Sequence, residues 1–129
     1  MPWVEVFAVF FVSHEVGDYL LQTDWQAMHK PGGLGDSLGR RALVEHLGTY
    51  MLAFVPALVW IALERTALRA VAVAVLVAVP HLLIDDGRLV RFWLRDVKHS
   101  PRPPVALAIA VDQSFHVLCL LGAALVAAG

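Results

Sequence analysis

The chain consists of four long apolar segments separated by short polar connections. The apolar segments cover about residues 2–22, 42–63, 67–86 and 105–128. Each holds roughly 20 residues, the length that an α-helix needs to cross the hydrocarbon core of a bilayer. Four such helices joined by short connections pack as an antiparallel bundle. We therefore expect an all-α integral membrane protein, a single four-helix antiparallel transmembrane bundle over residues 1–129.

The connection between the third and fourth segments has a helical pattern of its own. Over about residues 87–98, basic side chains recur every three or four residues and apolar side chains fill the opposite side. A short helix with this pattern lies in the membrane interface, where its basic groups contact anionic lipid headgroups. The alternative interpretation is a solvated, charged loop. The residues that we expect to contact anionic headgroups or an anionic substrate are Arg88, Arg91, Arg95 and Lys98.

Composition supports the membrane interpretation and excludes other classes of protein. Hydrophobic residues make up 59% of the chain and charged residues 16%, whereas soluble domains contain about 45–50% and 25%. The formal net charge of −1 gives no reason to expect nucleic-acid binding. The single cysteine, Cys119, excludes an internal disulfide and a paired-cysteine metal or redox motif.

Ionisable residues interrupt the apolar segments at a repeated spacing. Three segments each contain a histidine and an aspartate four residues apart, and the second segment contains a histidine near its start. These residues are His14 and Asp18, His46, His81 and Asp85, and Asp112 and His116. Residues four apart lie on one face of a helix. Ionisable groups are costly inside a membrane, so their repetition there indicates a shared function.

The antiparallel arrangement brings these groups to one end of the bundle. They lie late in the first and third segments and early in the second and fourth. The two connections at that end contain eight basic residues, whereas the opposite side has only Arg65 and Arg69. The positive-inside rule makes the more basic side cytoplasmic. We expect both termini outside and the polar cluster in the cytoplasmic half of the membrane.

Imidazoles and carboxylates that converge in apolar surroundings are the ligands of divalent transition metals. Zinc is the first expectation, and iron or manganese would suit the same donors. The predicted ligands are the seven His and Asp residues above, with Glu15 and Glu45 as further candidates. Seven groups exceed the roughly four to six that one ion needs, so either two ions bind or some groups orient the ligands. Asp18 and Asp112 are the candidate catalytic bases toward a metal-activated water.

The motifs resemble a family of small bacterial membrane proteins grouped as domain of unknown function 3307. The resemblance rests on His14-x-x-x-Asp18-Tyr-Leu-Leu-Gln22-Thr-Asp24-Trp25, the early His46, Pro80-His81-Leu-Leu-Ile-Asp85 and Asp112-Gln113-x-x-His116. The family usually has Ser-His-x-x-Ile-Asp in the third segment, and Pro80 stands where that serine would be. The resemblance implies a helical bundle in the bacterial inner membrane and brings no activity with it. By analogy, the pattern is also similar to membrane-bound metal-dependent hydrolases with intramembrane His and Asp residues.

Three functions therefore stay open. The leading hypothesis is a metal-binding membrane protein, in one form a metal-dependent hydrolase acting on a lipid-linked or membrane-surface substrate. The second is a proton or ion relay, or a transport subunit, which four helices would perform as an oligomer. The third is a structural subunit that presents its loops to a partner. The expected partners are membrane lipids and further copies of the chain or a larger membrane assembly, with no nucleic acid.

Overall fold

The protein is entirely helical in the computed structural model, which describes residues 1–129. The α-helices are α1 (Trp3–Glu15), α2 (Asp24–His29), α3 (Ser37–Glu64), α4 (Ala67–Asp85), α5 (Arg88–Phe92) and α6 (Val105–Ala128). Two π-helices, η1 (Val16–Leu20) and η3 (Trp93–Val97), continue α1 and α5, and a 3₁₀ turn, η2 (Gly33–Gly35), precedes α3. The helices α1, α3, α4 and α6 fall on the four apolar segments, which confirms the all-α prediction.

Three of these helices are long and apolar enough to cross a membrane: α3, α4 and α6. The first segment is shorter than the predicted span over residues 2–22. Its α-helical part has 13 residues, which at 1.5 Å per residue reach only about 20 Å. It then widens into η1 instead of continuing as an α-helix. Length and composition thus support three spans, and α1 is a shorter fourth helix.

The connection before α3 is more ordered than the sequence suggested. Thr23 caps α2 through a reciprocal pair of hydrogen bonds with Gln26, a capping box that satisfies free backbone groups at the helix start. The helix α3 begins at Ser37, five residues before the predicted segment, because the Asp36 carboxylate accepts a hydrogen bond from the Gly39 amide. Aspartate is a preferred N-cap residue, because its side chain accepts a hydrogen bond from a free backbone N–H of the first turn.

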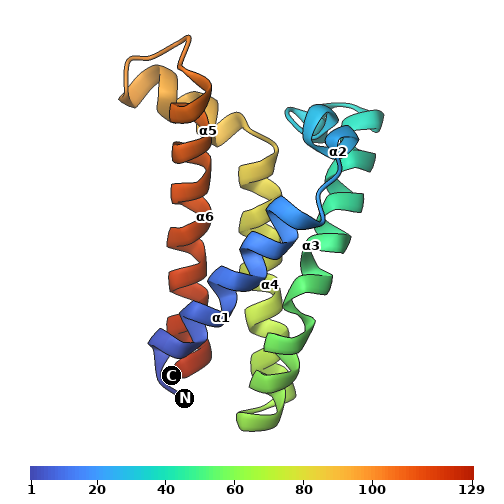
Figure 1. Cartoon of the computed structure of the whole chain (residues 1–129), viewed down its shortest axis with the longest axis vertical. Coiled ribbons are helices and arrows are strands. Elements are labelled where there is room, and N and C mark those ends of the chain that lie inside the picture. Colours follow the sequence, from blue (N-terminus) through green and yellow to red (C-terminus); the bar gives the residue numbers. More distant parts are fainter.

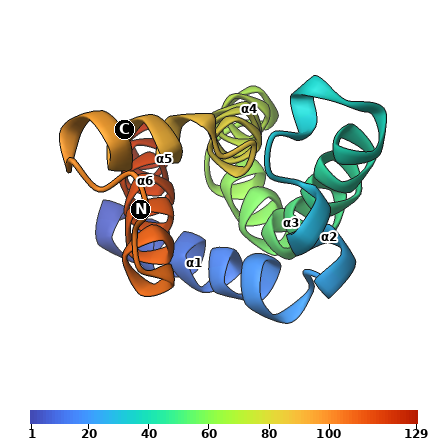
Figure 2. The ribbon, with the colours of Figure 1, turned by 90° about the horizontal axis from the view of Figure 1, so that it is seen from above.

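Helices α3, α4 and α6 stand side by side, and α1 crosses them diagonally on one face (Figures 1 and 2). Both chain termini lie at one end of the molecule, and α2 and α5 lie at the other (Figure 1). This is the placement that the antiparallel prediction requires: the connections after the first and third segments share an end. That end holds the polar groups of the apolar segments.

An apolar core fills the half of the molecule near the termini. It contains Val6 and Phe10 from α1, packed with Phe54 and Ile61 from α3 and with parts of α4 and α6. A smaller core, Ile84, Val90, Leu94 and Val111, joins α5 and η3 to α4 and α6. The polar groups lie between these two apolar regions, so their positions are set by packing on both sides.

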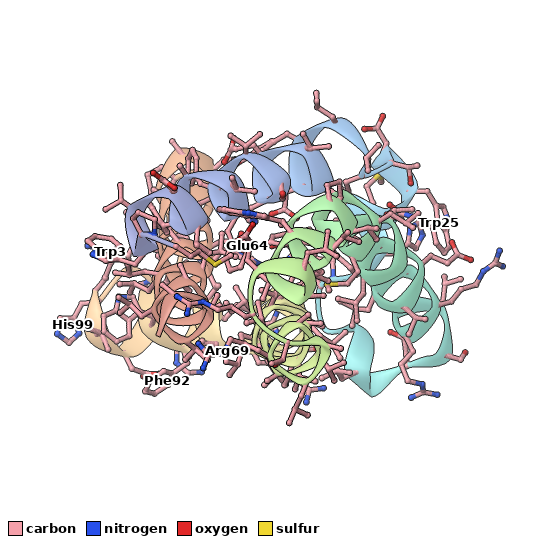
Figure 3. All side chains as sticks on the ribbon, turned by 90° about the horizontal axis from the view of Figure 1, so that it is seen from below. Trp3, Trp25, Glu64, Arg69, Phe92 and His99 are labelled. Atoms are coloured by element: carbon pink, nitrogen blue, oxygen red, sulfur yellow. The ribbon has the colours of Figure 1, made fainter.

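The segment over residues 87–98 is helical, as predicted, and packs by one face only. Val90 and Leu94 are buried, whereas Phe92 and Trp93 remain largely exposed. Phe92 projects from the periphery in the view from below (Figure 3). Basic side chains occupy the same exposed surface. The segment therefore presents both apolar and basic groups outward, the pattern of an interfacial helix.

Candidate metal centre

Helix α4 supplies the first two polar groups. His81 and Asp85 are one turn apart, both are buried, and His81 Nε2 lies 3.1 Å from Asp85 Oδ2. Pro80 lies inside α4 directly before His81. Proline has no N–H to donate, so a backbone carbonyl one turn earlier is released next to the polar pair.

Helix α3 adds His46, which is fully buried. Its Nε2 lies 3.1 Å from His81 Nε2 and 3.1 Å from Asp85 Oδ2. The imidazoles of two neighbouring helices thus meet edge to edge around one carboxylate oxygen. Their Nδ1 atoms are buried and have no hydrogen-bond partner.

The π-helix η1 delivers the fourth group, Asp18. Its Oδ1 lies 3.1 Å from His46 Nε2 and 3.7 Å from His81 Nε2. The wider turn shifts Asp18 from the position that a regular α-helix would give it, and π-helical turns are frequent at functional sites. Gly17 permits this approach, because a Cβ there would lie 2.5 Å from Tyr50 Cδ2.

Asp18, His46, His81 and Asp85 form a compact set of donors. One ligand atom from each lies within 4.8 Å of every other. Neighbouring ligands of a tetrahedral zinc ion, with metal–ligand distances near 2.0–2.1 Å, are about 3.3 Å apart. The measured spacings of 3.1 and 3.7 Å match that edge length. These buried groups are therefore positioned to bind a metal ion.

Hydrogen bonding alone does not account for this arrangement. Each imidazole nitrogen carries at most one hydrogen, yet His46 Nε2 faces Asp18, His81 and Asp85, all at 3.1 Å. Buried polar groups are costly unless each has a partner. A cation among the four residues would accept a lone pair from one ligand atom of each of them at once.

Asp85, Asp112 and His116 form a second group with metal-ligand spacing, and Asp85 belongs to both groups. His116 Nδ1 lies 3.0 Å from the backbone oxygen of Asp112, which can only accept a hydrogen bond. His116 Nε2 is then free to accept, and it faces Asp85 Oδ1 at 3.4 Å. Both of these atoms are buried without a hydrogen-bond partner. Two facing acceptors leave room between them for a shared proton or a second cation.

His14, predicted among the ligands, lies beside the four donors with both of its nitrogens engaged. Its Nε2 donates to Gln113 Oε1 at 2.7 Å, and its Nδ1 accepts from the Tyr50 hydroxyl at 3.0 Å. The orientation of the Gln113 side-chain amide is fixed by the same network, since its Nε2 donates to Asp18 and Asp112. His14 thus connects the cluster to Gln113 and Tyr50.

Three further residues belong to the site although the sequence interpretation did not include them. Gln113 bridges α6 to α1 and η1, as just described. The Tyr50 ring stacks on His81, with 3.5 Å between ring centroids and 12° between their planes. Lys30 reaches in from the loop before η2, and its Nζ donates to Asp85 Oδ2 at 2.9 Å and to Gln22 Oε1 at 2.6 Å. A tyrosine one turn after His46, and a glutamine beside Asp112, were the available signals.

Asp86 holds the Lys30 loop against the end of α4. Its buried carboxylate accepts a hydrogen bond from the Leu34 amide at 2.9 Å and pairs with Arg88 at 3.2 Å. Its backbone oxygen accepts from the Gly32 amide at 2.6 Å. Two separate hydrogen bonds, from the Leu34 and Gly32 amides, therefore fix the loop that carries Lys30.

The two glutamates that were further candidates lie outside the cluster. Glu45 is exposed and pairs with Arg41 at 2.7 Å. Glu15 is half-buried and belongs to neither group with metal-ligand spacing. A surface ion pair such as Glu45–Arg41 contributes little to stability.

The basic residues of α5 and η3 differ in their surroundings. Arg88 pairs with Asp86, and Arg95 with Asp96 at 2.7 Å. The Arg95 hydrogen bonds hold the pKa of the Asp96 carboxyl below its usual value. Arg91 makes no ion pair and lies on the wall of a cavity of about 550 Å³ that also borders Asp18, Asp85 and Asp112.

Comparison with known proteins identifies the family alone. No curated protein and no solved structure matches the chain. One family model, described as "Protein of unknown function (DUF3307)", matches residues 6–128. The match includes every residue of the cluster, the whole of α3, α4 and α6, and α1 from residue 6 onward. The chain therefore belongs to the family of proteins of unknown function DUF3307.

Proposed function

We propose that this protein is a membrane-embedded, metal-binding helical bundle whose metal centre serves a hydrolytic reaction at the membrane surface. The observation that carries the proposal is the convergence of Asp18, His46, His81 and Asp85, four buried donors from three helical elements, at spacings that suit one ion. Bundles build metal sites in this way, from ionisable side chains on facing helices.

The surface of the bundle supports insertion in a membrane. Large apolar side chains are exposed along all the long helices, among them Val12, Leu52, Leu83 and Leu118. In the most apolar stretch of α6, only 11% of residues are buried inside the molecule. Exposed apolar surface of this extent would be unfavourable in water and is expected in lipid. We infer that α1 crosses the membrane at a tilt beside α3, α4 and α6.

The charge distribution supports a cytoplasmic position for the site in a bacterial inner membrane. The end of the bundle with α2 and α5 holds eight basic residues, whereas the opposite end has Arg65 and Arg69. By the positive-inside rule, the end with α2 and α5 faces the cytoplasm and both termini face out.

We assign Asp18, His46, His81 and Asp85 as the ligands, with zinc as the first candidate ion and iron or manganese as alternatives. On this proposal, His14 orients the site through its hydrogen bonds and does not bind the ion. A divalent ion would supply a Lewis acid that activates water. Asp112 is the better placed of the two predicted bases, because its carboxylate is 29% exposed and borders the cavity. Asp18 is instead held by His46 and Gln113.

The experiment is elemental analysis of the protein purified in mild detergent, with no metal added during purification. Wild type is expected to carry one equivalent of a transition metal, and the His46→Ala, His81→Ala double variant none. His99→Asn is the matched control, because His99 is exposed in a loop with a φ of 53° that asparagine adopts readily. Wild-type protein that is folded but binds no transition metal even after incubation with zinc would exclude this function.

One observation favours a proton relay as the second candidate. Successive ionisable groups from Asp18 through His46, His81 and Asp85 to His116 lie 3.1–3.4 Å apart. Such a chain can pass protons across part of a membrane. Proton flux into liposomes that carry the purified protein, abolished in His81→Ala, would favour the relay over a metal centre.

A further inference from the structure

A cavity of about 550 Å³ opens beside the proposed metal ligands. Its lining residues come from η1, α2, the Lys30 loop, α5, η3 and the start of α6. These elements meet at the end of the molecule that carries α2 and α5 (Figure 1). Its volume is within the range of small-molecule sites, roughly 300–1,000 Å³. Asp18, Asp85 and Asp112 border it, so a ligand in the cavity would reach the proposed metal centre directly.

Two cations border this cavity, Lys30 and Arg91. Lys30 is tied to Asp85 and Gln22, which uses two of the three hydrogens of its ammonium group. The exposed Arg91 side chain makes no hydrogen bond or ion pair with the protein, so its guanidinium is free to bind an anion. Its Nη1 lies near Gly87, 3.2 Å from where a Cβ on that glycine would be.

Part of the cavity wall is apolar. Leu94 comes from η3, and Ala108 and Ile109 come from the first turns of α6. Ile109 is half exposed on the outer face of the bundle, so this wall continues into the surface that faces lipid on the proposed topology. The cavity thus offers cations together with apolar side chains along which an alkyl chain could lie.

The charges on the wall decide when an anion can bind. Three carboxylates against two cations leave the cavity with a net charge of −1. A divalent ion at Asp18, His46, His81 and Asp85 would change this charge to +1. Charge complementarity then favours an anion only after the metal has bound. Lysine and arginine together suit a phosphate group, one as a point charge and the other as a planar fork.

We propose that this cavity binds a monoalkyl phosphate amphiphile from the membrane. Its phosphate headgroup would contact Lys30 and Arg91, and its alkyl chain would lie along Leu94 and Ile109. The proposal rests on the metal centre proposed above and names the substrate class of that centre. Binding follows metal loading, because the empty centre leaves the cavity negative. The phosphate source is an amphiphile, because part of the cavity wall is apolar and open toward lipid.

The test uses the full chain in phosphatidylcholine nanodiscs, in a zinc-loaded form freed of excess ion and in a form stripped with chelator. Calorimetric titration compares hexyl phosphate with inorganic phosphate and with hexanol. The zinc-loaded protein is expected to bind hexyl phosphate at least about tenfold more tightly than inorganic phosphate, because burial of a few methylene groups suffices for that factor. Hexanol is expected not to bind, since it lacks the charge.

Two variants locate the phosphate. Arg91→Gln is expected to weaken hexyl phosphate binding by about tenfold or more, the scale of a lost charged hydrogen bond. Arg40→Gln is the matched control, because Arg40 is an exposed arginine at the same end of the bundle that does not border the cavity. It is expected to leave affinity unchanged.

The outcomes separate this inference from the metal centre. If the protein binds zinc but not hexyl phosphate, or if Arg91→Gln and Arg40→Gln behave alike, the cavity proposal is overturned and the metal centre stands. Equal affinity for inorganic phosphate would overturn the membrane source, and equal affinity without zinc would overturn the dependence on metal. A protein that fails to bind zinc at all fails the proposed function first.

Discussion

Gly17→Ala tests whether the close approach of η1 to α3 positions the metal ligands. An alanine Cβ at this position would lie 2.5 Å from Tyr50 Cδ2 and 3.2 Å from Tyr50 Cα, whereas ordinary contacts begin at 3.4 Å. About 1 Å of movement is therefore required. Tyr50 is fully buried and stacks on His81, so the ring cannot retreat without pushing His81. If η1 retreats instead, it carries Asp18 away from His46.

The expected magnitude follows from these contacts. Overpacking a buried contact costs about 1–3 kcal/mol of the free energy of unfolding, against a gain of up to about 1 kcal/mol from replacing glycine in a helix. Metal–ligand distances tolerate only about 0.2 Å. A displacement of either Asp18 or His81 is expected to weaken metal binding by about 10–100-fold, as for other losses of ligand positioning.

The assay is thermal unfolding in detergent together with zinc affinity from competition with a chelator. Gly48→Ala is the matched control, because Gly48 lies in α3 and a Cβ there meets nothing within 4 Å. Gly48→Ala is expected to be neutral or slightly stabilising and to leave zinc affinity unchanged. Wild-type zinc affinity in Gly17→Ala, or an equal loss in both variants, would refute the argument that this contact sets the ligand geometry.

Three further predictions concern the surroundings of the site. Tyr50→Phe keeps the ring on His81 but removes the hydroxyl that donates to His14 Nδ1. Because that buried nitrogen loses its partner, we expect the free energy of unfolding, measured by chemical denaturation, to fall by about 1–3 kcal/mol, with metal stoichiometry unchanged. A stability equal to that of wild type would contradict this prediction. Asp86→Ala removes the acceptor of the Leu34 amide, so we expect faster hydrogen exchange at Leu34, measured by mass spectrometry, while amides in the middle of α4 exchange as in wild type. Acidification is expected to release the bound metal, because protons compete for the nitrogens of His46 and His81. The zinc retained after dialysis should fall as the pH is lowered from neutral. Zinc retention that does not depend on pH would argue against imidazole ligands.

Much of the architecture could be predicted from the sequence because the apolar segments are long and clearly bounded. The ends of α4 and α6 lie close to the predicted bounds, since polar or helix-breaking residues such as Thr66, Gly87 and Pro104 flank them. The first segment was predicted less well. Apolar content indicates its existence, but not that the helix would widen at Val16, because a π-turn depends on what packs against it.

The candidate site was predicted in outline and not in detail. The four-residue spacing of His and Asp and the antiparallel order were enough to place His46, His81, Asp85 and His116 at one end of the bundle. They could not distinguish His14, which hydrogen-bonds with both nitrogens, from His46, which faces three other ionisable groups. That difference depends on the neighbours of each ring, and only the packed helices specify them.

The sequence by itself determined the helical class, the apolar segments, the end of the bundle that carries the polar groups and the family to which the chain belongs. The first three properties follow from composition, from hydrophobic patterning and from the 3.6-residue period of the helix, whereas the family follows from the motifs around the His and Asp residues. The tertiary structure decided which donors share one site, because that depends on how η1, α3 and α4 approach one another within a few tenths of an ångström. It also brought Lys30 to Asp85 and Arg91 to the cavity wall. Such contacts join residues far apart in the chain, and no local pattern encodes them.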